Sequence, residues 1–260
     1  MSKQRRYEVT DTQWEQLRKY FPQRKAGDRG RPRNEDRPIL NGILWIMRTG
    51  APWEDLPERY GAKSTVYDRF VLWQKSGLFA KILEELGEEA DLENIGMDST
   101  SVDAHQHSAG AKKGAENAET QQHIGVSRGG KTTKIFAIVD ALGNPIHVHL
   151  VAGNVHDSKE AEPSLTSVQL GEGTTVLADK AFGSKAIRAF ITSSGAEYCI
   201  PPKANEIPWY YDKHLYKERH LVECFFQKLK QYRGIATRFC KLAFRFLAFV
   251  QLASVMIWLA

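Results

Sequence analysis

The stretch from Tyr216 to Lys230, YKERHLVECFFQKLK, places a glutamate inside a basic and aromatic segment. It is rich in helix-forming residues and has no Gly or Pro, which favours an α-helix. At about 100° per residue, one stripe about 60° wide holds Tyr216, Arg219, Glu223 and Lys230. The opposite face carries Leu221, Val222, Phe225, Phe226 and Leu229. The stripe is either an ordinary solvated face with i,i+4 charge pairs or a functional face that holds a carboxylate among cations.

The charge distribution around this segment indicates a polyanionic partner. The chain has 260 residues and a formal net charge of +5, long enough for one large or two smaller domains. Residues 1–34 carry ten Lys or Arg against four acids, and residues 202–245 repeat that ratio. Residues 82–95 contain six acids and no base. Nucleic acid fits the two basic regions, although solvated surface charge is the simpler alternative.

Cysteine usage and the two ends of the chain indicate a reduced, cytoplasmic setting. The three cysteines form no CxxC pair and no disulfide-rich pattern, which disfavours structural zinc. The first residues lack the apolar core of a signal peptide. Residues 246–260 are almost entirely apolar but short for a membrane span, so we expect a buried terminal helix.

The first 90 residues predict a helical domain. A helix capped by Thr10 or Asp11 precedes a basic loop rich in Gly and Pro, and a second helix is expected at about 36–48. A short helix near 53–59, a turn and a helix over about 64–75 form the outline of a helix-turn-helix. We expect DNA-contacting side chains on the outer face of its second helix: Lys63, Thr65, Tyr67 and Arg69. Many three-helix bundles share this outline, which leaves a purely structural role open.

Residues 91–260 have the pattern of an α/β domain with a mixed sheet. Five short apolar or alternating runs, bounded by Gly, Asn and Pro, predict strands. The second and third runs are joined by ALGN, a hairpin signal. Helices are expected at about 158–169 and 184–194, and a polar, glycine-containing loop separates the first two strands.

Two aspartates lie where strands are expected to end. Asp98 follows the first run in IGMDST, and Asp179 follows the fourth in VLADKAFG. With Glu223 on a neighbouring helix, they could converge on one or two divalent cations. Two such ions can activate an attacking oxygen and stabilise a leaving oxygen in phosphoryl transfer. Taken singly, each aspartate could equally be a turn or cap residue.

These residues resemble a known family. The spacing Y-x2-R-x3-E-x6-K of Tyr216, Arg219, Glu223 and Lys230 is similar to the C-terminal signature of DDE transposases from bacterial insertion sequences. The resemblance extends to MDSTSVDAH, LADKAFGS, the GN-x2-D segment at 153–157 and GAPWEDLPERYG, and so covers nearly the whole chain.

The resemblance implies a ribonuclease H-like catalytic domain after an N-terminal helix-turn-helix-like domain. It implies a metal-binding and catalytic triad of Asp98, Asp179 and Glu223, holding two Mg²⁺ ions with Mn²⁺ as a substitute. It further implies DNA contacts from Tyr216, Arg219 and Lys230. Only 44 positions separate Asp179 from Glu223, which leaves no room for a large inserted domain. Relatives with such an insertion use it to handle hairpin ends, so the resemblance does not extend to that chemistry.

Other polar residues are weaker candidates. His105, His107 and His123 lie around a polar loop without a Cys partner, so DNA contact or solvation is favoured over metal binding. Asp103 is an odd number of positions from Asp98, so it should leave the cluster. The resemblance suggests that His156 and Asp157 steer a loop near the site. Ser99 and Ser101 have no activating base in the sequence, which argues against a nucleophile.

The sequence therefore predicts a DNA transposase with a helical DNA-binding domain over 1–90 and a ribonuclease H-like domain over 91–260. It would bind terminal inverted repeats as a homodimer, cleave the ends, and join the 3′ ends to target DNA. Two alternatives remain: a metal-dependent nuclease that never joins ends, and a DNA-binding regulator on a degenerate scaffold. The intact acids at all three positions argue against the regulator.

Overall fold

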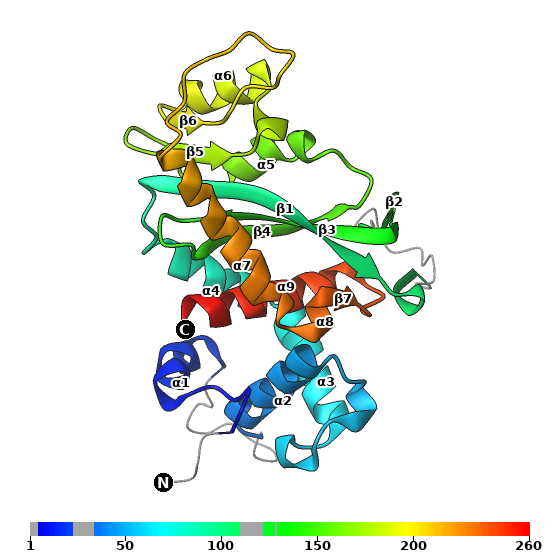
Figure 1. Ribbon diagram of the computed structural model, residues 1–260. Helices are drawn as coiled ribbons and strands as arrows, with labels where there is room; N and C mark the ends of the chain where they lie inside the picture. The colour runs from blue at the N-terminus through cyan, green and yellow to red at the C-terminus, as the bar shows by residue number, and fades with distance from the viewer. Residues whose placement is uncertain (1–4, 23–33, 110–121, 128) are drawn as a thin grey trace.

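The computed structural model describes residues 5–22, 34–109, 122–127 and 129–260 (Figure 1). Most of the predicted basic loop after Phe21, and most of the polar loop before the hairpin, lie outside these residues. The described chain begins with a helical region and continues into a mixed sheet covered by helices on both faces (Figure 1).

The helical region follows the predicted pattern. Thr10 caps α1 (Asp11–Leu17), and its side chain and that of Gln13 form a reciprocal capping box. The short turn η1 (Arg18–Tyr20) follows, and then α2 (Asp36–Thr49). The short helix expected near 53–59 is two separate turns, η2 (Trp53–Asp55) and η3 (Glu58–Tyr60), each preceded by a proline. Two further helices complete the region, α3 (Lys63–Lys75) and α4 (Leu78–Gly87).

The sheet confirms the predicted mixed topology. Strands β1 (Asn94–Ala104), β3 (Gly130–Val139) and β4 (Pro145–Ala152) are antiparallel neighbours, and the ALGN hairpin joins β3 to β4. On the other side, β1 pairs in parallel with β5 (Thr175–Ala178), which pairs in parallel with β6 (Glu197–Cys199). The full path is β4-β3-β1-β5-β6, with β2 (Gly125–Ser127) also on β3 and β7 (Thr237–Arg238) on β1.

Short helices connect these strands. The turn η4 (Gln106–Ala109) follows β1, and η6 (Asp157–Lys159) and α5 (Ala161–Thr166) follow β4. The turn η7 (Lys180–Phe182) and α6 (Lys185–Ser193) lie between β5 and β6. The helix α5 is shorter than the predicted 158–169 because a separate 3₁₀ turn occupies its first residues.

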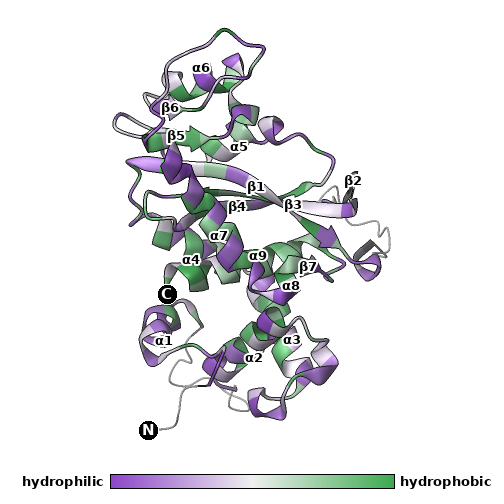
Figure 2. Cartoon of the chain, viewed as in Figure 1, coloured by the Kyte–Doolittle hydropathy of each residue, from purple (hydrophilic) through white to green (hydrophobic). Residues whose placement is uncertain are grey.

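The C-terminal part places helices across the sheet. The 3₁₀ turn η8 (Leu215–Arg219) leads into α7 (His220–Lys230), so the predicted single α-helix from Tyr216 is wrong in its first turn. After the short α8 (Arg233–Ala236) comes α9 (Ala243–Trp258), whose apolar character is visible in Figure 2. This helix is largely buried, as predicted. Within the described residues, no helix has the length and apolar character that a membrane span requires.

Two apolar cores lie on opposite faces of the sheet. One lies under α5 and α6 and includes Phe136, Val176 and Ile191. The other joins α7 and α9 to α1–α4 and to the opposite sheet face, through residues such as Phe70, Phe225 and Phe249. This second core crosses the predicted boundary at residue 90. The division into domains 1–90 and 91–260 stays a prediction, but packing does not separate them.

Candidate active site

Asp98 and Asp179 meet where the β1–β5 pair ends. The parallel register runs from Asn94 opposite Thr175 to Met97 opposite Ala178, so the next residue on each strand is an aspartate. The prediction that Asp98 ends its strand is wrong, because β1 continues to Ala104 along β3. Asp179 does follow the last residue of β5, where its side chain caps η7 by accepting from the Ala181 N–H at 2.7 Å.

Glu223 and Asp98 are joined through Arg219. The guanidinium of Arg219 donates to Asp98 Oδ2 at 2.9 Å and also forms an ion pair with Glu223 Oε1. These three residues come from β1, the end of η8 and the first turn of α7. The helix therefore brings a carboxylate 125 positions distant in sequence next to the β1 aspartate, with a cation between them.

Burial and neighbouring charges perturb this cluster. The side chains of Asp98 and Arg219 are 22% and 18% exposed, whereas that of Glu223 is 50% exposed. Burial raises the pKa of Asp98, with a smaller contribution from Asp179, and the Ser99 N–H and Arg219 oppose the rise. Burial lowers the pKa of Arg219, but the charges of Asp98, Tyr216 and Glu223 outweigh it and raise that pKa overall. For Asp98, the nearby Arg219 guanidinium thus opposes part of the effect of burial on the pKa.

Tyr216 and Lys230 lie at opposite ends of this arrangement. Tyr216 is close to the Arg219 guanidinium, and burial together with the Asp179 charge raises the pKa of its hydroxyl. Lys230 Nζ donates to the carbonyl of Ser101 on β1 at 3.1 Å. Burial lowers the pKa of Lys230, while the Asp103 charge opposes the change. The four-residue stripe therefore runs alongside β1 from the aspartates toward its C-terminal half.

Among the described residues, β1 has no strand partner between Met97 and Asp103 on its edge away from β3. It pairs with β5 up to Met97 and with β7 only from Asp103. In between, the Ser99 N–H donates to its neighbour Asp98 and the Ser101 carbonyl accepts from Lys230. Two backbone groups of this stretch are thus paired with side chains of the site, those of Asp98 and Lys230.

The carboxylate chemistry suits a hard divalent cation, but the observed cluster is arranged around a guanidinium. Carboxylate oxygens are the ligands that Mg²⁺ and Mn²⁺ prefer. Asp98 and Asp179 are near enough for their charges to interact. Across the part of the chain that the structure describes, however, no three His, Cys, Asp or Glu side chains form a group that could hold an ion. Glu223 could join the two aspartates only if its contact with Arg219 opened.

The four predicted DNA contacts on α3 divide into two pairs. Lys63 is exposed and bonds to Glu54 at 2.9 Å, and Thr65 is half-buried. Tyr67 packs edge-on against Trp53 at 5.2 Å and accepts a hydrogen bond from Arg245. Arg69 forms an ion pair with Asp36 in which the two side chains are only 12% and 13% exposed. The prediction that Tyr67 and Arg69 point outward is wrong, because both join neighbouring elements.

The weaker candidates occupy other environments. The ring of His105 stacks near His107 and Phe239, at 4.9 and 4.8 Å between ring centroids. Asp103 is exposed and pairs with Thr132 of β3, on the face of β1 opposite Asp98, as its odd spacing predicts. Sequence reasoning missed Lys134, whose ammonium lies near Ser99. Its signal was a lysine directly before the apolar run at residues 135–139 of β3.

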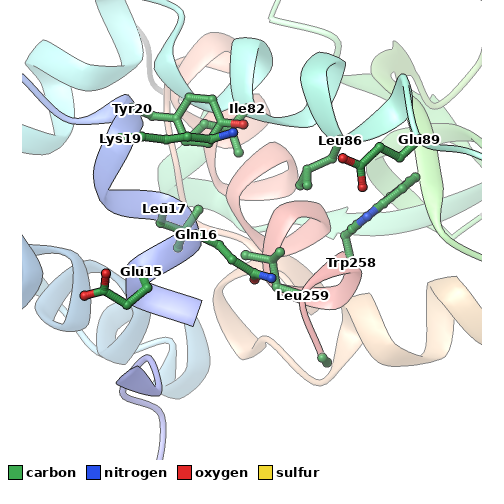
Figure 3. A pocket seen from close by; sticks show the side chains of 11 residues that line it. Glu15, Gln16, Leu17, Lys19, Tyr20, Ile82, Leu86, Glu89, Trp258 and Leu259 are labelled. Atoms are coloured by element: carbon green, nitrogen blue, oxygen red, sulfur yellow. The ribbon is translucent and has the colours of Figure 1, made fainter. Parts of the chain in front are cut away.

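A hollow of about 470 Å³ lies between α1, α4 and the end of α9 (Figure 3). Tyr20, Leu86 and Trp258 contribute to its walls, and none of the predicted site residues does. Gln13 Nε2 donates to the Leu259 carbonyl at 3.2 Å, so this hollow belongs to the packing of the helices.

Comparison with known proteins gives two matching family models. Residues 92–258 match "Transposase DDE domain", and residues 9–83 match "Putative transposase of IS4/5 family". A Brucella ovis protein, "Putative transposase for insertion sequence element IS6501", is 43% identical over 131 residues, covering 49% of this chain and 98% of the relative. The Sinorhizobium fredii "Uncharacterized protein y4sN" is 40% identical over 121 residues, covering 46% of this chain and 96% of the relative.

Solved structures give a remote likeness. In "Mos1 transposase paired-end complex with left transposon end", 12% of residues are identical, with a TM-score of 0.28 and coverage of 85% of this chain and 87% of that chain. For "Crystal structure of the Mos1 mariner paired end complex with Mn" the identity is 13% and the TM-score 0.29, with coverage of 95% and 84%.

Proposed function

Because the chain belongs to the family of transposases with a DDE domain, we propose that it cuts and joins DNA at the ends of an insertion sequence. Its catalytic part would be a ribonuclease H-like domain. A mixed sheet supports this, with one aspartate on central β1 and the next at the end of parallel β5. The observation that supports the proposal is that Asp98 lies near Asp179 at the end of that strand pair and is joined to Glu223 through Arg219.

We propose that Asp98, Asp179 and Glu223 hold divalent cations, with Mg²⁺ as the natural ion and Mn²⁺ as a substitute. Two such ions would supply activation of an attacking oxygen and stabilisation of the leaving oxygen. Burial raises the pKa of Asp98 against the opposing effects of the Ser99 N–H and Arg219, and a bound cation would further favour its charged form. Glu223 would be the ligand that moves to reach the cation, because its side chain is half-exposed and its ion pair with Arg219 would have to open.

The cationic and aromatic residues of the stripe would bind the DNA strand that is cut. Arg219 would exchange its carboxylate partners for phosphate oxygens, which a guanidinium can engage with two hydrogen bonds. Lys230 would hold a phosphate farther along β1, and Tyr216 would pack beside the strand near Asp179. The Lys63 and Thr65 end of α3 would read the terminal repeat, with Tyr67 and Arg69 holding that helix in place. A homodimer that bridges two ends would be the working unit.

The test is cleavage of a DNA duplex that carries the element's end, with Mg²⁺ present. Asp98→Asn and Asp179→Asn should each abolish cleavage and leave DNA binding and thermal unfolding nearly unchanged, because the amides are similar in shape but are poor ligands for Mg²⁺. Asp91→Asn, in the exposed acidic segment before β1, is the matched control and should cut normally. Retained Mg²⁺-dependent cutting by either site variant would refute the carboxylate assignment.

A second assay separates a transposase from a nuclease. Pre-cut ends with free 3′ hydroxyls are incubated with a supercoiled plasmid, and joined products are counted. We expect joining by the wild-type chain and none by Asp179→Asn. Cutting of intact ends without any joining would instead assign a nuclease.

A further inference from the structure

The far face of β1, opposite Asp98, carries a partly buried charged network that the proposed chemistry does not use. Ser99 Oγ donates to Asp157 Oδ1 at 2.9 Å, and Lys134 Nζ donates to the same oxygen at 2.8 Å. The side chains of Lys134 and Asp157 are only 16% and 29% exposed. Three elements, β1, β3 and η6, therefore meet at one carboxylate oxygen.

The register of β1 on β3 places this network directly behind the aspartate. Asp98 stands opposite Ala137, whose side chain belongs to the core under α7 and α9. Ser99 stands opposite Phe136, which belongs to the core under α5. Successive side chains of a strand point to opposite faces. Ser99 thus has its hydroxyl on the Asp157 face, while its backbone N–H donates to Asp98 Oδ1 at 2.8 Å.

The segment that carries Asp157 is held in place at several points. Lys134 Nζ also donates to the Val155 carbonyl at 2.8 Å, and the Gly153 N–H donates to the Thr132 carbonyl at 3.2 Å. A Cβ at Gly153 would lie 1.9 Å from Thr132 Oγ1, so the close approach of this segment to β3 requires glycine. The turn η6 also packs beside η7, which follows Asp179. Asp157 is therefore held in place on the face of β1 opposite Asp98.

We propose that Asp157 and Lys134 are positioning residues that hold Asp98 in place through Ser99. This inference rests on the proposed function, because it assumes that Asp98 binds a divalent cation. The Lys134 ammonium neutralises and orients Asp157, Asp157 fixes the Ser99 hydroxyl, and the Ser99 N–H fixes one Asp98 oxygen. Mutation of a residue that orients a metal ligand typically lowers metal affinity or activity by about 10- to 100-fold.

The experiment measures Mn²⁺ binding to the full chain by electron paramagnetic resonance, without DNA or turnover. Asp157→Asn and Ser99→Ala should each weaken Mn²⁺ binding by about tenfold or more, and Ser99→Thr, which keeps the hydroxyl, should restore most of it. The Ser99→Ala/Asp157→Asn double variant should lose little more than either single variant, because both act through one hydrogen bond. Single-turnover cleavage at saturating DNA should need correspondingly more Mg²⁺.

Glu160→Gln is the matched control. Glu160 forms a similarly buried pair with His149 three positions from Asp157, without a contact to Ser99. It should change thermal unfolding without changing Mn²⁺ affinity. An equal loss of affinity in Glu160→Gln, or wild-type affinity in Asp157→Asn and Ser99→Ala, would overturn the inference. If Asp157→Asn does not fold, the comparison of Ser99→Ala with Ser99→Thr decides.

The proposed metal site can be refuted separately from this inference. If wild-type protein binds Mn²⁺ and Asp98→Asn does not, the metal assignment holds, and unaffected positioning variants then refute this inference alone. If Asp98→Asn binds Mn²⁺ as well as the wild type, the metal assignment itself fails.

Discussion

At the scale of single residues, Arg219 forms ion pairs with two acids of the candidate site at once. It holds Asp98 on the sheet and Glu223 on α7, and its own charge is favoured by both. A guanidinium fits this position because its planar fork can address two carboxylates at once. Arg219 therefore occupies the position between Asp98 and Glu223 in the absence of an ion. The same guanidinium also suits a DNA phosphate.

Glu223 and Lys230 share one stripe but should fail in different ways. Glu223→Gln should stop cleavage even at saturating DNA, because it removes a ligand needed in the chemical step. Lys230→Ala should weaken DNA binding and reduce its salt dependence by roughly one counterion, with activity partly recovered at high DNA concentration. Single-turnover cleavage against DNA concentration at two salt concentrations measures both. Full cleavage by Glu223→Gln would make the stripe an ordinary helix surface.

At the scale of elements, α3 is anchored by the residues that face its neighbours. Arg69→Ala should lower the free energy of unfolding by about 1–3 kcal/mol, because it removes a largely buried ion pair with Asp36. A Lys63→Ala/Thr65→Ala variant should change stability by at most about 0.5 kcal/mol and weaken binding to the element's end more than to random DNA. Urea unfolding and binding to both DNAs test this. Equal losses on the two DNAs would exclude α3 as the reader.

The strand β4 carries a pH-sensitive pair. His147 Nε2 lies 3.2 Å from His149 Nδ1, and burial lowers the pKa of each imidazole from 6.5 to about 4. The folded chain therefore keeps both rings neutral at pH values where the unfolded chain takes up protons. Stability should be unaffected above pH 6.5 and should fall as the pH drops from about 6.5 toward 4.

The loss should reach on the order of 3 kcal/mol for each ring and roughly twice that for the pair, since one pKa unit corresponds to about 1.4 kcal/mol. Urea unfolding at pH 7, 5.5 and 4.5 measures it, with a His147→Gln/His149→Gln variant as the control. The control should lose less stability than the wild type over this range. Parallel losses in the two proteins would assign the acid sensitivity to other groups.

At the scale of the whole molecule, α9 joins the helical region to the sheet. Phe249 lies 4.9 Å from Phe70 of α3 and 6.5 Å from Trp53, between ring centroids, and α9 also packs on α4, α7 and β4. One continuous core therefore serves the N-terminal helices and one face of the sheet. The N-terminal helical region and the sheet should therefore unfold together.

Phe249→Ala should lower the free energy of unfolding by about 3–5 kcal/mol, because it leaves a cavity in a buried aromatic cluster. Phe244→Ala, on the same helix but 39% exposed, is the control and should cost far less. Calorimetry should show a single transition for both variants. Two separated transitions would mean that the predicted domains 1–90 and 91–260 are independent after all.

The sequence by itself located most of the helices and strands and placed Asp179 at the end of a strand, whereas Asp98 lies inside β1. Hydrophobic periodicity located α2, α3, α7 and α9 and the five main strands, because local patterns control local structure. The register of β1 on β5 set Asp98 beside Asp179, and the path of α7 set Glu223 beside Arg219; both are long-range pairings that no local pattern encodes. The helical spacing that predicted an outward-facing Arg69 likewise could not show its partner Asp36, because that acid lies 33 positions away. The tertiary structure decided which polar side chains remain free for a ligand, because charged groups on a helix face are satisfied by whichever element packs beside them.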